Sequence, residues 1–193
     1  WNYFADCLTK CSDTFNANQQ IFGKVYFPRL IVPFSIVISN MVKMGIQLVL
    51  FLVVYAYYFI VLGTFEINWT IVLFPVLLMM LASLGLGFGL VISSLTTKYR
   101  DLRFLITFGV QLWMYATPVI YPLSVMKQNY PDKIWVIVAN PLTAIIETFK
   151  YGFTGVGVFE WNYLLYSFVM SIAVLLLGII VFNRVQKNFM DVI

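Results

Sequence analysis

Long, mostly apolar runs alternate along the chain with short clusters of charged residues. A membrane-spanning helix needs about 20 apolar residues, because the hydrocarbon core is roughly 30 Å thick and each helical residue rises about 1.5 Å. Four runs meet this length: 31–62, 69–95, 104–123 and 161–183. Because these runs are continuous and do not alternate with a period of two, they predict helices rather than barrel strands. We therefore predict an all-α, polytopic helical membrane protein with a single transmembrane domain over residues 1–193.

Two further segments do not fit this spanning pattern. Residues 1–22 begin with aromatic and apolar side chains and become polar near residue 16, which indicates the end of a span running into a loop. The run 134–146 has thirteen uncharged residues, too few to cross a bilayer, and the Asn140-Pro141 pair inside it should break a helix. We interpret 134–149 as a re-entrant or interfacial element.

Charge is scarce and unevenly distributed along the chain. Only 10% of the residues are charged, against about a quarter in soluble domains. The stretches 23–30, 96–103 and 184–193 together carry seven of the twelve Lys and Arg residues. Because basic loops stay on the cytoplasmic side, these stretches and the C-terminus are predicted to be cytoplasmic. The element at 134–149 must then lie on the outer side without crossing, since a crossing would place the basic tail outside.

The loop between the second and third runs carries more than a topology signal needs. Lys98, Arg100 and Arg103 suffice to hold this loop in the cytoplasm. Asp101 and Tyr99 add the opposite charge and an aromatic ring, as a docking surface for a cytoplasmic partner would. From the residues alone, both interpretations stay open.

The first run carries a polar stripe along one helical face, made of Ser35, Ser39, Asn40, Lys43 and Gln47. These residues fall within an arc of about 140° on a helical wheel. A charge at the bilayer centre costs about 2.5–3.5 kcal/mol on insertion scales, so Lys43 should face other helices or water. Two interpretations follow. Either Lys43 snorkels to the cytoplasmic interface, or the stripe is the polar wall of a conduit in which Lys43 attracts an anionic substrate.

Small residues in the second run indicate close helix packing. Gly85, Gly89 and Ser93 stand four positions apart, in the small-xxx-small pattern of helix contacts in lipid. Cys7 and Cys11 share a helical face in a geometry poorly suited to a disulfide, so we expect two small buried side chains. The chain has no His and too few Cys for a zinc site. We therefore expect no metal site and no catalytic residues.

Prolines interrupt the third run before it can reach the far side. Residues 104–116 provide about 20 Å of helix, after which Thr117-Pro118 and Tyr121-Pro122 follow in close succession. Broken backbone at such a depth is tolerated where protein covers it or where it lines water. Together with Asn140-Pro141, this pattern predicts two short half-helices that form an outer lid. The alternative is a simple proline kink.

Aromatic side chains crowd the outer half of the chain. They are Trp113, Tyr115, Tyr121, Tyr130, Trp135, Phe149, Tyr151, Phe153, Phe159 and Trp161. An interfacial aromatic belt explains them. Platforms on which sugar rings stack are a second interpretation, and both can hold.

Six short motifs lie in order along the whole chain. They are Lys24-Val-Tyr-Phe-Pro-Arg29, Lys98-Tyr-Arg-Asp-Leu-Arg103, Gln111-Leu-Trp113, Thr117-Pro-Val-Ile-Tyr-Pro-Leu-Ser124, Asn140-Pro141 followed by Glu147, and Phe189-Met-Asp-Val-Ile193. In order and spacing they resemble the permease subunits of bacterial ABC exporters for lipid-linked polysaccharide, the O-antigen, capsule and teichoic-acid export family. The resemblance implies six spans, about five of them present here, with short re-entrant helices on the outer side. It also implies an amphipathic helix and a first span before Trp1, where the chain starts without Met or a signal-peptide pattern.

The resemblance further implies a function and a set of partners. The chain would be the permease subunit of an ATP-driven exporter in the bacterial inner membrane, with a cytoplasmic C-terminus and a lipid-linked glycan as substrate. It would work as a homodimer with two copies of an ABC ATPase subunit, which would hold ATP and Mg. The chain itself would bind no cofactor and no nucleic acid, and membrane lipids would surround it.

Three groups of site residues follow from the residues and the resemblance together. The ATPase-coupling loops would use Lys24, Tyr26, Arg29, Tyr99, Arg100, Asp101 and Arg103. The substrate path would use Ser35, Ser39, Lys43, Gln47, Trp113 and Tyr115. The outer lid would use Thr117, Pro118, Tyr121, Pro122, Asn140, Pro141 and Glu147.

Three other functions compete with this one. An ABC exporter of drugs or small lipids would use the same architecture. A membrane-embedded transferase of lipid-linked sugars would need Asp132 or Glu147 as an acid on the outer face, although no carboxylate pair stands at a useful spacing. A purely structural membrane subunit would need neither the polar stripe nor the broken span.

Overall fold

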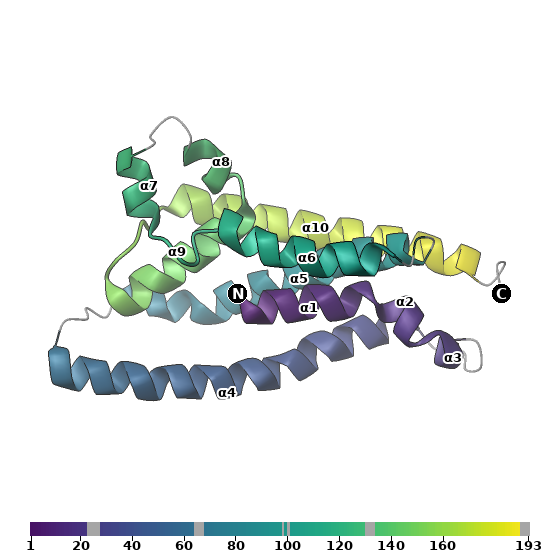
Figure 1. The fold of residues 1–193 in the computed structure, drawn as a ribbon, viewed down its shortest axis with the longest axis horizontal. Helices are drawn as coiled ribbons and strands as arrows, with labels where there is room; N and C mark the ends of the chain where they lie inside the picture. Colours follow the sequence, from purple (N-terminus) through teal and green to yellow (C-terminus); the bar gives the residue numbers. More distant parts are fainter. Residues whose placement is uncertain (23–27, 64–67, 98, 100, 130–133, 190–193) are drawn as a thin grey trace.

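The computed structural model describes residues 1–22, 28–63, 68–97, 99, 101–129 and 134–189. The elements assigned in these residues are all helical: α1 (Asn2–Ser12), α2 (Thr14–Ala17), α3 (Gln19–Phe22), α4 (Ile31–Leu62), η1 (Trp69–Leu73), α5 (Phe74–Thr96), α6 (Leu102–Ala116), α7 (Leu123–Asn129), α8 (Ile134–Val138), α9 (Pro141–Thr154) and α10 (Trp161–Phe189). Helices α1, α4, α5, α6 and α10 run along the length of the molecule (Figure 1). Helices α7, α8 and α9 gather at one end, called here the α9 end, and α2 and α3 lie at the other, the α2 end.

Three helical segments of the described chain are long and apolar enough to cross a membrane: Ile31–Val61, Trp69–Thr96 and Trp161–Gln186. They confirm three of the four predicted spans and a polytopic helical membrane protein. The second of them opens with a 3-10 turn, Trp69–Leu73, before α5 begins. The remaining run forms only α6, with 15 residues or about 22 Å of helix, in agreement with the predicted break after residue 116.

Helix α6 ends where the sequence predicts a break. Thr117 adopts an extended conformation with φ −107° and ψ 141°, which is the conformation that a residue before proline prefers. The chain then turns and continues as α7 instead of resuming the same helix. Likewise, α8 ends at Val138 and α9 begins at Pro141, so residues 134–146 do not form one helix. The prolines therefore terminate these helices and do not merely kink them.

Glycines let α5 pack closely against α1 on one side and α10 on the other. A Cβ atom on Gly85 would lie 2.9 Å from the Cβ of Cys7, and a Cβ on Gly89 would lie still closer to the Cβ of Cys11. On the other side of α5, a Cβ on Gly178 of α10 would lie 2.5 Å from the carbonyl oxygen of Gly87. The predicted small-residue packing is confirmed, and both cysteines are buried and free.

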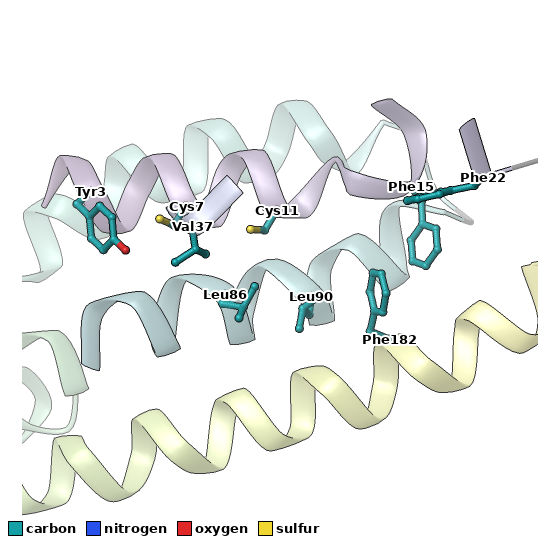
Figure 2. Close-up of a cluster of buried hydrophobic side chains, with 9 residues drawn as sticks. All are labelled: Tyr3, Cys7, Cys11, Phe15, Phe22, Val37, Leu86, Leu90 and Phe182. Carbon is teal, nitrogen blue, oxygen red and sulfur yellow. The ribbon is translucent and has the colours of Figure 1, made fainter. Parts of the chain in front are cut away.

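The core follows this line of contact between α1, α5 and α10. Figure 2 shows Cys7 and Cys11 of α1 above Leu86 and Leu90 of α5, with a cluster of phenylalanines at the α2 end. Helix α4 contributes little to the core, because most of its apolar side chains are exposed, up to 80% at Ile60. In lipid such exposure carries no hydrophobic penalty. Gly63, with φ 59°, ends α4 as a left-handed cap.

Candidate functional site

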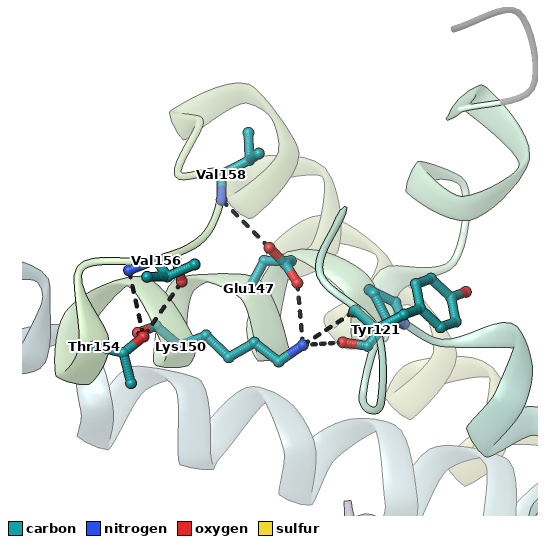
Figure 3. Close-up of polar contacts among 7 residues, drawn as sticks. Tyr121, Glu147, Lys150, Thr154, Val156 and Val158 are labelled. Atoms are coloured by element: carbon teal, nitrogen blue, oxygen red, sulfur yellow. Dashed lines mark hydrogen bonds and ion pairs between the residues drawn. The ribbon is translucent and has the colours of Figure 1, made fainter. Parts of the chain in front are cut away.

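An ion pair on α9, Glu147 with Lys150, bonds to backbone groups of the neighbouring segments at the α9 end (Figure 3). The carboxylate of Glu147 is 1% exposed and lies 3.3 Å from Lys150 Nζ, one helical turn further along. Its other oxygen accepts a hydrogen bond from the backbone N–H of Val158 at 3.3 Å. Gly157, with φ 147°, brings this backbone so close that a Cβ there would lie 3.3 Å from Glu147 Oε2. Both carboxylate oxygens are therefore engaged inside the protein.

Lys150 extends this pair to the break after α6. Its ammonium group donates to the backbone carbonyls of Pro118 and, at 3.3 Å, of Tyr121. Both carbonyls lie in the non-helical segment between α6 and α7, where no helical hydrogen bond satisfies them, so the ammonium group supplies a donor that each carbonyl needs. Lys150 thereby fastens α9 to the non-helical segment that follows α6.

Asn140 makes a second link between the same two elements. Its side-chain oxygen caps α9 by accepting from the N–H of Leu142 at 3.2 Å. Its amide nitrogen donates to Thr117 Oγ1 at 2.8 Å, and that hydroxyl donates to the carbonyl of Trp113 at 2.9 Å. The end of α6 is thus tied to the start of α9 by side chains as well as by Lys150.

The structure therefore brings together the predicted lid residues. Thr117, Pro118, Tyr121, Asn140 and Glu147 take part in these contacts. Pro141 is the first residue of α9, and Pro122 is exposed just before α7. Sequence reasoning missed Lys150. The signal was present, since Lys150 stands three residues after Glu147 in an otherwise apolar helix.

A cavity of about 460 Å³ borders this cluster at Val119 and Lys150 and is lined by residues of α1, α4, α5, α6 and α9. Its walls are mainly apolar, with Phe51, Leu77 and Phe149 among them, while Gln47 and Lys150 add polar groups. Of the predicted substrate-path residues, Gln47 lines this cavity. Trp113 instead lines an apolar hollow between α1, α5 and α6.

The remaining path residues are divided between the protein interior and its surface. Trp113 packs edge-on against Phe4 and Phe88, at ring distances of 5.5 and 5.2 Å. Tyr115 is 63% exposed on α6. Ser35 and Ser39 are exposed on α4, where the Ser35 hydroxyl bonds a carbonyl of its own helix. The structure therefore does not gather these residues into one site within a single chain.

The centre of the polar stripe faces α1. Lys43 Nζ lies 2.5 Å from Asp6 Oδ2, and Lys10 Nζ donates to Asn40 Oδ1 at 2.8 Å. Asn40 is buried, and its amide also contacts the thiol of Cys7. Lys43 thus has a counter-charge on a neighbouring helix, which neither the snorkelling nor the conduit interpretation included. Asp6 and Lys10 stand on the charged face of α1.

At the α2 end, the predicted coupling residues separate into two groups. Tyr99 is 56% exposed and Asp101 is also exposed, so both are accessible. Arg29 is 6% exposed, donates to the carbonyl of Gln186 at 3.3 Å and lies over the ring of Phe22. Arg103 forms an ion pair with Asp13, the residue before α2. Lys24, Tyr26 and Arg100 lie outside the described residues.

The described residues give little geometric support to metal binding or to sugar transfer. Among them, no group of three His, Cys, Asp or Glu side chains is placed to hold a metal ion. The transferase hypothesis requires an accessible acid, but Glu147 is buried and both of its oxygens are occupied. Asp132, the other acid named for that role, lies outside the described residues.

Comparison with known proteins gives consistent matches over most of the chain. The sequence pattern of the family described as ABC-2 type transporter matches residues 3–154. A protein of Klebsiella pneumoniae named "O-antigen export system permease protein RfbA" is 25% identical over 194 aligned positions, covering 100% of this chain and 71% of that protein. A protein of the same name from Myxococcus xanthus is 25% identical over 150 positions, or 78% of this chain and 55% of that protein.

Proposed function

The chain belongs to the ABC-2 type transporter family, and we propose that it is the permease subunit of an ATP-driven exporter that moves lipid-linked polysaccharide across the bacterial inner membrane. The proposed substrate class is supported by two proteins named as O-antigen export permeases, which align with 100% and 78% of the chain. An exporter of drugs or small lipids would share the architecture, but no feature of the described residues favours it. The chain would move its substrate without breaking bonds in it.

The observation that carries this proposal is the interrupted helix α6 with α9 folded against its end. Helix α6 spans about 22 Å, less than the roughly 30 Å hydrocarbon core. The non-helical backbone after Ala116 is tolerated at that depth because α9 covers it and Lys150 satisfies its carbonyls. We infer that this covered break is a lid at the outer end of the path, which opens when α9 and the end of α6 separate.

Two copies of the chain would be needed to enclose a path wide enough for a polymer. On α6, Phe104, Phe108 and Tyr115 are 77%, 61% and 63% exposed. In the proposed homodimer, this face of α6 meets the second copy or the substrate. Ser35, Ser39 and Gln47, which lie on the stripe of α4, are the proposed polar part of the path. Trp113 contributes from the neighbouring hollow.

The α2 end is the proposed cytoplasmic end, where two ABC ATPase subunits dock and hydrolyse ATP with Mg. The basic stretches 23–30, 96–103 and 184–193 favour this orientation, as they keep their loops and the C-terminus inside. Tyr99 and Asp101 are the described residues best placed for docking, because both are exposed between α5 and α6. Lys24, Tyr26 and Arg100 complete this proposal from the sequence.

The proposal is tested by purifying the full-length protein with its native partners. We expect a C-terminally tagged protein, extracted from its host in mild detergent, to carry a Walker-type ATPase in equal amounts. In proteoliposomes, the complex should export a lipid-linked glycan in an ATP-dependent manner. Asp101→Lys should reduce ATPase binding and leave membrane insertion unchanged. Absence of an ATPase under several mild conditions would contradict the proposal.

A further inference from the structure

The stretch that leads into the first proposed coupling loop contacts the second one. The first stretch runs from the end of α1 through α2 and α3, residues 12–22, and the second joins α5 to α6, residues 96–103. Thr96 Oγ1 donates to the carbonyl of Ser12 at 2.9 Å. One residue further along, Asp13 Oδ2 lies 3.1 Å from Arg103 Nη1. The second contact is between full charges and joins the start of α2 to the first turn of α6.

Asp13 depends on Arg103 for compensation of its charge. Its side chain is only 14% exposed, and its other oxygen, Oδ1, is buried with no hydrogen-bond partner among the described residues. A carboxylate that is largely removed from water needs a counter-charge. No other ion pair of Asp13 is present in the described part of the chain. Removing Arg103 would therefore leave a buried negative charge without its partner.

The position of Arg103 is not explained by the stability of α6. Arg103 is the second residue of that helix, where the helix dipole is positive and a cation is unfavourable. A guanidinium there gains nothing from its own helix, and its pairing with Asp13 is the interaction that compensates it. The Arg103 side chain is 60% exposed, but its guanidinium reaches Asp13 of the first stretch, a contact within the chain that the assignment of Arg103 to the ATPase did not include.

The first stretch is also fastened to α10. Phe15 of α2 stacks on Phe182 of α10 with ring centroids 4.6 Å apart, and Phe22 of α3 packs edge-on against Phe15 at 6.0 Å. Figure 2 shows these rings meeting at the α2 end. Phe182 is fully buried. Residues 12–22 therefore contact α10 through aromatic packing of α2, and α6 through the ion pair of Asp13, the residue before α2.

We propose that the Asp13–Arg103 pair transmits ATP-driven displacement of α2 and α3 to the base of α6. This inference rests on the proposed function, because it requires an ATPase that moves the first stretch. Coulomb attraction falls slowly with distance, so an ion pair keeps acting through a small displacement, whereas a van der Waals contact is lost. Arg103 is then a positioning residue inside the permease. Helix α6 carries the displacement to its other end, where the break and α9 lie.

The test uses the full-length permease with its ATPase in proteoliposomes, and measures ATP hydrolysis and glycan export separately. Asp13→Asn and Arg103→Gln should each lower export per ATP hydrolysed about fivefold, because Arg103 is 60% exposed and solvent weakens the pair to about 1 kcal/mol. ATPase binding and ATP hydrolysis should stay within about twofold. The exchange Asp13→Arg with Arg103→Asp should restore export. Lys127→Gln, which removes an exposed ion pair at the α9 end, is the matched control and should change nothing.

Each result separates this inference from the proposed function. Export per ATP that stays normal in both single variants overturns the inference. Lost ATPase binding in Arg103→Gln, without rescue by the charge exchange, assigns Arg103 to the ATPase interface and overturns the inference while the proposed function stands. Failure of the wild-type protein to bind any ATPase contradicts the proposed function itself. If Asp13→Asn unfolds, Arg103→Gln and the conservative Arg103→Lys, which should keep export, carry the test.

Discussion

Replacing Lys150 with Met should loosen the α9 end without changing the length of the side chain much. The substitution removes the counter-charge of Glu147, which is 1% exposed, and the donor to the carbonyls of Pro118 and Tyr121. Breaking a buried ion pair by removing one partner costs about 3–5 kcal/mol. Because the Lys150 side chain is 26% exposed, we expect the lower end, about 3 kcal/mol of unfolding free energy.

Thermal unfolding of the full-length protein in lipid nanodiscs measures this loss. Lys127→Met is the matched control, because it removes an ion pair with Glu160 at the same end of the molecule, with side chains 55% and 36% exposed. Exposed pairs contribute about 0–1 kcal/mol, so the control should unfold close to the wild type. If the covered break is the proposed lid, Lys150→Met should also raise passive leakage of small solutes from liposomes, whereas Lys127→Met should not.

A second substitution distinguishes loss of the pair from loss of packing. Adding Glu147→Gln to Lys150→Met removes the uncompensated carboxylate, so the double variant should recover part of the lost stability. The reasoning is refuted if Lys150→Met unfolds with the Lys127→Met control. It is refuted equally if the double variant is less stable than Lys150→Met alone.

Three further predictions concern packing, the polar stripe and orientation. Gly178→Ala should destabilise the protein by about 1–3 kcal/mol in thermal unfolding, because the added Cβ would lie 2.5 Å from a carbonyl oxygen of α5. Gly109→Ala, with nothing within 4 Å, should be neutral or stabilise by up to about 1 kcal/mol, because Ala favours a helix over Gly. Equal destabilisation by both substitutions would contradict the close packing. Lys43→Leu leaves Asp6 without its counter-charge beside a candidate membrane span, where an unpaired charge is costly, so the variant should unfold at a lower temperature. Adding Asp6→Asn removes that charge and should restore the unfolding temperature. A glycan export defect that persists in the double variant would instead favour direct contact of Lys43 with substrate. A Cys in place of Val156, which is 61% exposed, should react with an impermeant thiol reagent added outside the cell, and labelling from the cytoplasmic side alone would invert the proposed orientation.

The features that the sequence predicted correctly depend on local chemistry. The end of α6 at Thr117 follows from the proline after it, which excludes the helical conformation at the preceding residue. The start of α9 follows from Asn140 and the proline next to it, a cap and a favoured first helical residue. The close packing at Gly85 and Gly89 follows from their spacing on one helical face.

The features that the sequence did not reveal depend on which helices become neighbours. The helical wheel showed that Lys43 and Asn40 share a face, but not that the charged face of α1 lies opposite them. Lys150 donates hydrogen bonds to carbonyls about thirty residues earlier in the chain. These groups meet only because the chain turns back between α6 and α9. For the same reason, the basic loop of residues 96–103 gave no sign that Arg103 pairs with Asp13.

The contacts at the two ends of α6 suit this helix to carry a displacement from the α2 end to the α9 end. Of the fifteen residues in this helix, Val110 alone is buried, and Trp113 packs against Phe4 and Phe88, while ion pairs and hydrogen bonds hold its two ends. At the α2 end, Arg103 is fixed by Asp13; at the α9 end, Lys150 and Asn140 hold the residues that follow the helix. Because its backbone hydrogen bonds keep a helix rigid along its axis, displacement at one end must appear at the other. A helix that is held at both ends, and that contacts the core between them mainly through Val110 and Trp113, could move as a unit with local repacking against α1 and α5. The Asp13–Arg103 pair would therefore couple α6 to the movement of α2 and α3. The contacts of Lys150 would oppose separation of α9 from the end of α6, which is the opening of the proposed lid.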